Sequence, residues 1–108
     1  MKKEILINLE LDETQTPTAM SWNTSDATEG DMPCKAMQLC VWDPKEKSSL
    51  RVDLWTKDFY KEEMDLFILQ NIMTMADSYE RATHKKELAD ILRTMGKEFG
   101  NKAGITYT

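Results

Sequence analysis

The sequence lacks several features that would assign a function class directly. It has two cysteines and one histidine among 108 residues, and no catalytic or metal-binding constellation stands out, so we expect no cofactor. No apolar run approaches the length of a membrane-spanning helix, and we therefore expect no membrane insertion. The chain also has no basic stripe, which argues against nucleic acid or an anionic membrane surface as a partner.

The two cysteines, Cys34 and Cys40, are six positions apart in a segment with the pattern of a strand. At ~3.3 Å per residue, they would lie roughly 20 Å apart, too far for a disulfide. We expect free thiols in a reducing compartment. The start Met-Lys-Lys resembles a secretion signal, but Glu4 and later polar residues interrupt it. These observations favour a cytoplasmic location.

What is present is typical of a folded protein. Hydrophobic residues make up 41% of the chain and charged residues 31%. The length predicts a single domain over residues 1–108. The net charge of −5 comes from residues 1–33, which hold two basic and seven acidic groups, whereas the remainder holds twelve of each. This acidic charge would suit a basic protein partner.

Alternation of apolar and polar residues predicts strands in the first half of the chain. We expect strands at 5–11, around Met20 and Trp22, at 35–42 and at 50–55. Residues 25–33 have turn formers and little apolar content, and we expect a mobile loop there. Residues 43–49 would form the turn of a β-hairpin between the last two strands.

The second half has helical periodicity. Asp58 is the expected N-cap of a long helix that ends near Thr83, with Glu62 and Glu63 in its first turn. Its apolar arc covers about 200°, which requires cover on two sides. The sheet and a second helix would supply that cover.

The second helix has apolar residues at helical spacing. These are Leu88, Ile91, Leu92, Met95 and Phe99. We expect Thr83 to cap its start, Gly100 and Asn101 to stop it, and residues 102–108 to form a tail. The predicted class is therefore α+β: a four-stranded, mostly antiparallel sheet followed by a two-helix hairpin packed on one face, in the order ββββαα.

The two faces of the predicted hairpin differ. The aliphatic face, which we expect to hold the core, has Met37, Leu39, Val41, Leu50, Val52 and Leu54. The opposite face has Trp42, Arg51, Asp53 and Trp55, residue types that favour a protein-interaction site. Either a protein partner or a second copy of the chain would dock there. The alternative is that strand one, the loop or the chain termini cover the indoles.

Other candidate sites have simpler interpretations. Asp77, Glu80 and His84 carry side chains that a divalent metal would accept, yet three groups at a helix end usually form a solvated edge. Asp77 and Arg81 are expected to form a surface ion pair. The acidic residues of the first helical turn, Glu62, Glu63 and Asp65, suit the helix dipole better than acid–base catalysis. The helical methionines, Met64, Met73, Met75 and Met95, are better explained by core packing than by a groove.

Several motifs, in the same order, resemble those of the gliding motility-associated protein GldC family. They are Leu11-Asp-Glu13, Pro17, Trp22, Lys35-Ala36, Val41-Trp-Asp43, Leu50-Arg-Val-Asp-Leu-Trp-Thr-Lys-Asp58, Glu63-Met64 and Met75-Ala-Asp-Ser-Tyr-Glu-Arg-Ala-Thr83. The resemblance implies an accessory role in gliding and in the linked secretion apparatus. It brings no active site.

The expected function is therefore that of a non-enzymatic cytoplasmic accessory protein that associates with an unidentified protein, with a homodimer as one form. The competing class is a small-ligand-binding domain or a cryptic enzyme. Its pocket would lie between the long helix and the sheet, where Asn71 or Tyr79 would orient a bound molecule.

Overall fold

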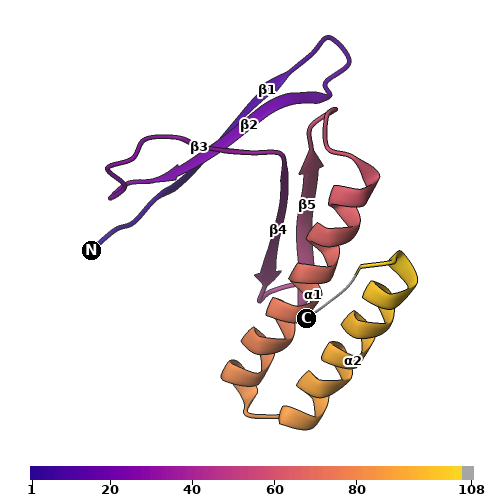
Figure 1. The fold of residues 1–108 in the computed structure, drawn as a ribbon. Coiled ribbons are helices and arrows are strands. Elements are labelled where there is room, and N and C mark those ends of the chain that lie inside the picture. The colour runs from indigo at the N-terminus through magenta and orange to yellow at the C-terminus, as the bar shows by residue number, and fades with distance from the viewer. Residues whose placement is uncertain (106–108) are drawn as a thin grey trace. The chain divides into compact units, whose positions relative to one another are not determined.

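The computed structural model describes residues 1–105 and divides the chain into two compact units, Met1–Phe59 and Tyr60–Thr108. Within the described residues, the first unit contains five strands and the second contains two helices (Figure 1). We call them the strand unit and the helical unit and describe each by itself. The α+β class is confirmed. The predicted packing of the helical hairpin on a sheet stays a prediction.

The first sheet is antiparallel, with strand order β1-β2-β3. It consists of β1 (Ile5–Leu11), β2 (Pro17–Thr24) and β3 (Met32–Cys34). The predicted strand at 5–11 is confirmed. The predicted short strand around Met20 and Trp22 is longer than expected, because all seven residues of β1 pair with β2. Met20 is buried and belongs to the small core of this unit.

The second sheet is a separate hairpin, so the prediction of one four-stranded sheet is wrong. It consists of β4 (Ala36–Asp43) and β5 (Ser48–Trp55), which pair only with each other among the described strands. The chain bends at Lys35, between β3 and β4. The bend separates the strand that pairs with β2 from the strand that pairs with β5, and two sheets result.

The predicted mobile loop at 25–33 is wrong at its C-terminal end, since it contains the start of β3. Pro33 lies opposite Ser21 in the ladder with β2. Proline has no N–H to donate, but it is tolerated in an edge strand. A three-residue strand is also too short for alternation to reveal. Cys34 and Cys40 consequently lie in different sheets, and both are free thiols.

Residues 56 and 57, directly after β5, connect the two sheets by hydrogen bonds. The Thr56 N–H donates to the Lys35 carbonyl at 2.9 Å, and the Lys57 N–H donates to the Pro17 carbonyl at 3.3 Å. The Lys57 ammonium also pairs with Asp12, in the turn between β1 and β2. Residues 56 and 57 therefore link the end of β5 to the start of β2 and to the bend before β4.

Asp58 takes part in this corner and does not cap the helix, which corrects the predicted N-cap. Its carboxylate accepts a hydrogen bond of 2.6 Å from the Thr56 hydroxyl and pairs with the Lys35 ammonium at 3.5 Å. Helix α1 (Lys61–Thr83) instead has Tyr60 as its N-cap, and the Tyr60 N–H donates to Glu63 Oε1 at 3.2 Å. The predicted acidic first turn and the helix end at Thr83 are confirmed.

Helix α2 (Lys86–Ala103) is longer than predicted. Gly100 does not stop it, because the helix ends at Gly104, which adopts a left-handed conformation with φ of 77°. Thr83 does not cap it either, since the N-cap is Lys85. The predicted tail at 102–108 is therefore helical at its start, and residues 106–108 lie outside the described part of the chain.

Small residues bring the two helices together. A Cβ atom on Gly96 would lie 2.5 Å from the Met73 sulfur, and one on Gly100 would lie 3.2 Å from Leu69 Cδ2. Leu69 is 1% exposed and is the largest fully buried side chain among the described residues. The helices therefore approach closely at Gly96 and Gly100, where a larger residue would force neighbouring side chains to shift.

This close approach changes which predicted core residues are buried. Leu88, Ile91 and Met95 of α2 are about half exposed, contrary to the prediction, as is Met75 of α1. The fully buried residues on α2 are Ala89, Gly96 and Gly100. The buried positions of α2 are thus occupied by small residues.

Candidate protein-interaction surface

The register of β4 and β5 determines which side chains share a face. Residues directly opposite each other in an antiparallel pair point to the same side. Met37 lies opposite Leu54, and the next aliphatic pairs follow the same rule. The predicted division into two faces is therefore confirmed. Four residues of the aliphatic face, Leu39, Val41, Leu50 and Val52, are about half exposed, and the expected cover of this face by the helices stays a prediction.

The opposite face consists of four cross-strand pairs, which we call the tryptophan surface. In order from the open end of the hairpin to its turn, the pairs are Ala36 with Trp55, Gln38 with Asp53, Cys40 with Arg51, and Trp42 with Ser49. All four residues predicted as an interaction site lie on it. The cross-strand register places them there.

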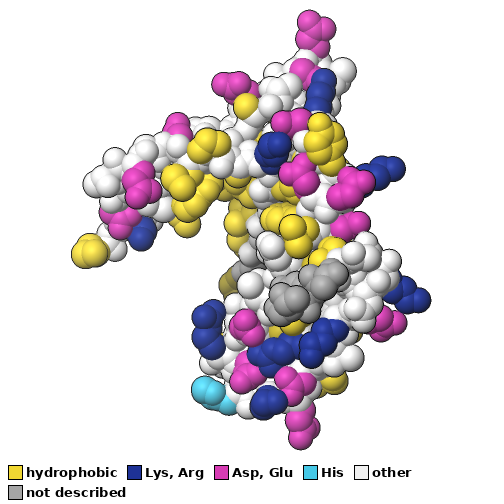
Figure 2. All heavy atoms as spheres, in the orientation of Figure 1, with side chains coloured by type: hydrophobic (Ala, Val, Ile, Leu, Met, Phe, Trp, Pro, Cys, Tyr) yellow, Lys and Arg dark blue, Asp and Glu magenta, His cyan; other side chains and the backbone are white. Residues whose placement is uncertain are grey.

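The two indoles lie at opposite ends of this surface. Trp42 is 63% exposed and lies near the turn, beside the small Ser49. Trp55 is 51% exposed and lies at the open end, beside the small Ala36. Within the strand unit, neither β1 nor the loop at 25–33 covers these indoles, and cover by the C-terminus stays a prediction. Figure 2 shows hydrophobic side chains exposed over the strands.

The centre of the tryptophan surface carries one ion pair. Arg51 and Asp53 are two positions apart on β5, and alternation places both side chains on the same face. The Arg51 Nε donates to Asp53 Oδ2 and its Nη2 donates to Oδ1, each at 2.9 Å. This bidentate contact raises the pKa of Arg51 and lowers the pKa of Asp53.

The ion pair makes the surface electrically balanced. Arg51 contributes one positive charge and Asp53 one negative charge, while the other six residues are not Asp, Glu, Lys or Arg. The excess acidic charge of the chain therefore lies elsewhere. A partner for this surface needs flat apolar areas at both ends and one charge of each sign between them.

An apolar hollow of about 270 Å³ also lies within the strand unit. It is lined by Ile5, Ile7, Trp22, Cys34, Ala36, Met37, Gln38 and Leu39. The lining includes no acidic or basic side chain, so the hollow suits a small apolar group rather than an acid–base reaction. The predicted pocket between the long helix and a sheet, with Asn71 or Tyr79, stays a prediction.

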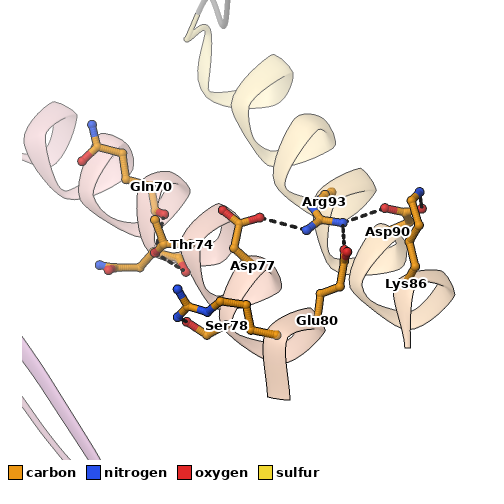
Figure 3. Close-up of polar contacts among 10 residues, drawn as sticks. Gln70, Thr74, Asp77, Ser78, Glu80, Lys86, Asp90 and Arg93 are labelled. Atoms are coloured by element: carbon orange, nitrogen blue, oxygen red, sulfur yellow. Dashed lines mark hydrogen bonds and ion pairs between the residues drawn. The ribbon is translucent and has the colours of Figure 1, made fainter. Parts of the chain in front are cut away.

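The helical unit has a charged cluster that sequence reasoning missed (Figure 3). Arg93 Nη1 donates to Glu80 Oε1 and to Asp90 Oδ1, and its Nη2 donates to Asp77 Oδ1, each at 2.8 Å. These three carboxylates raise the pKa of Arg93, whose side chain is 24% exposed. The only sequence signal for this cluster was the spacing of Asp90 and Arg93.

This cluster corrects two interpretations. Asp77 pairs with Arg93 and not with Arg81, whose guanidinium donates to the Ser78 hydroxyl at 3.2 Å. The carboxylates of Asp77 and Glu80, considered above with His84 as metal ligands, are bound by the same guanidinium. Across residues 1–105, no three Asp, Glu, His or Cys side chains are placed to hold a metal ion.

Comparisons with known proteins complete the description. In the part of the chain that the structure describes, neither helix has the length and apolar content needed to cross a bilayer. No curated protein and no solved structure matches the chain. A family model described as gliding motility-associated protein GldC-like matches residues 17–105. The match covers all strands except β1, and both helices, and on this evidence the chain belongs to the GldC-like family.

Proposed function

We propose that this protein is a non-enzymatic accessory factor of bacterial gliding motility and its linked secretion apparatus, and that it acts in the cytoplasm by binding another protein chain through the tryptophan surface. The family supports the association with gliding motility. The observation that supports the docking role is the exposure of Trp42 and Trp55 on one face of the β4–β5 hairpin.

Tryptophan and arginine are enriched among the residues that dominate binding energy at protein interfaces. A two-stranded sheet is marginally stable in water unless something packs against it. A partner chain that covers the tryptophan surface would bury both indoles and support the hairpin.

The proposal is tested in a gliding bacterium that carries this protein by replacing both Trp42 and Trp55 with threonine in the chromosomal copy. We expect loss of colony spreading with an unchanged amount of folded protein, since both side chains are exposed. The matched control replaces Leu88 and Ile91, two exposed apolar residues of α2, with threonine and should glide normally.

Two results would contradict the proposal. One is normal gliding by the double tryptophan variant at normal protein levels. The other is a large increase in Tm on adding a metabolite or divalent metal to a strictly monomeric protein. That result would favour the small-ligand-binding alternative.

A further inference from the structure

We propose that the tryptophan surface binds a second copy of this chain, face to face, about a two-fold axis that runs across the strands. This inference rests on the proposed function, which places the docking site on this surface, and it names the partner. Three properties of the surface support this dimer: the order of the four cross-strand pairs, the size of each side chain and the charges between the indoles.

Side-chain sizes along the hairpin are complementary to their own reversed order. A two-fold axis across the strands places β4 over the partner's β4 and reverses the order of the pairs. Trp42 then lies over the partner's Ala36, and Trp55 lies over the partner's Ser49. Each large indole therefore meets a small side chain, and the two sheets approach without a clash between indoles.

The charges show the same self-complementarity. The reversal that matches large to small residues also places Arg51 over the partner's Asp53 and Asp53 over the partner's Arg51. The ion pair within each chain becomes part of a group of four charges of alternating sign. A strongly basic partner would gain nothing from this surface, because its own charges already sum to zero.

The size of the surface predicts weak association. Each strand has eight residues, so the hairpin is about 26 Å long and about 10 Å wide. Two such faces bury less than the roughly 800 Å² per partner of a standard stable interface. We therefore expect a dimer with a Kd in the micromolar range, which forms or dissociates with concentration.

Sedimentation equilibrium with charge reversals tests this geometry. Wild-type protein should pass from monomer to dimer between about 1 and about 500 µM. Arg51→Asp alone and Asp53→Arg alone should each weaken the homodimer at least tenfold, because like charges then face each other across the axis. An equal mixture of the two variants should form a heterodimer, and R51D/D53R in one chain should restore the homodimer.

The control reverses a charged pair on the helical unit, with Lys86→Asp and Asp90→Lys tested singly, and should leave the dimer Kd unchanged. Circular dichroism melting verifies that every variant is folded. The proposal is overturned if the wild type remains monomeric at all concentrations, or if the mixture does not recover association. If the double threonine variant at Trp42 and Trp55 still lost gliding in that case, the tryptophan surface would bind a different protein. The dimer and the proposed function can therefore fail separately.

Discussion

Different interactions hold the strand unit and the helical unit together. The helical unit buries Leu69 and Ala76 on α1 and three small residues on α2, and charged contacts join the two helices at Arg93. The strand unit has Met20 and Thr56 as its buried residues, and backbone ladders and a polar corner hold its segments together. Hydrogen bonding can thus define the strand unit while its apolar side chains stay accessible to a partner.

A single leucine in each unit shows the largest expected difference in stability. Leu69→Ala should lower the free energy of unfolding by about 2 to 5 kcal/mol, because it removes a fully buried side chain and leaves a cavity. Leu50→Ala, at a position 57% exposed in the hairpin, should cost less than about 1 kcal/mol. Urea unfolding measures both. Equal losses would contradict the distinction between the units.

The close helix contact is tested at Gly96. Gly96→Val should destabilise the protein by about 1 to 3 kcal/mol, since the new side chain would collide with Met73 and Ile72. Lys97→Val introduces the same side chain at the next, exposed position and should change stability by about 0.5 kcal/mol or less. Thermal unfolding compares the two variants. A stable Gly96→Val protein would show that the helices do not require this glycine.

The charged cluster offers a smaller test. Arg93→Met should lower Tm and raise the pKa of Asp90 toward its ordinary value, although Lys86 still holds that pKa down. Arg81→Met removes a guanidinium whose described contact is a hydroxyl, and it should leave the pKa of Asp90 unchanged. NMR titration of the carboxyl groups measures the difference. An unchanged Asp90 pKa in Arg93→Met would contradict the cluster.

The smallest effect concerns the turn of the strand unit. The Lys57 ammonium, the Thr16 N–H, and the hydroxyl and N–H groups of Thr14 hold the pKa of Asp12 well below its ordinary value of 3.8. A carboxyl group with a lowered pKa stabilises the folded state above its unfolded pKa, and this stabilisation is lost as the pH falls through the folded pKa. The free energy of unfolding should therefore decline below about pH 4.

Replacing Asp12 measures how much its carboxyl group contributes to the pH dependence of the free energy of unfolding. Asp12→Asn should be less stable than wild type at pH 7, and the gap should narrow as the pH falls from about 4 to about 2. Glu13→Gln, the neighbouring exposed position, should follow the wild-type curve. Denaturant titrations at several pH values test this. A gap that does not change with pH would contradict the assigned role.

Local sequence patterns predicted most of the strands and helices. They failed where pairing or packing with a distant segment determines the structure. Alternation identified β1 and the two faces of the β4–β5 hairpin, because side-chain direction in a strand depends only on position. It missed β3, whose three residues include Pro33 and are ordered by pairing with β2. The capping preference of glycine wrongly predicted a helix stop at Gly100, which instead lies within α2 and packs beside Leu69.

The polar and aromatic sites also differ in whether local sequence could predict them. Trp42, Arg51, Asp53 and Trp55 were recognised as one face because the hairpin register follows from sequence alternation. The partners of Arg93 at Asp77 and Glu80 are 16 and 13 positions away in sequence and become neighbours only through helix packing. The corner role of Asp58 likewise depends on Lys35, far along the chain.

Thiol alkylation, measured in unmodified protein across a range of concentrations, reports directly on dimer formation through the tryptophan surface. Cys40 lies at the centre of the tryptophan surface, opposite Arg51, whereas Cys34 lies in β3 and serves as an internal control. Peptide mass spectrometry follows both thiols in the same sample. If a second copy covers this surface, Cys40 alkylation should slow severalfold as the protein concentration rises, whereas Cys34 alkylation should stay constant. A Cys40 rate that does not depend on concentration would contradict the binding of a second copy through the tryptophan surface.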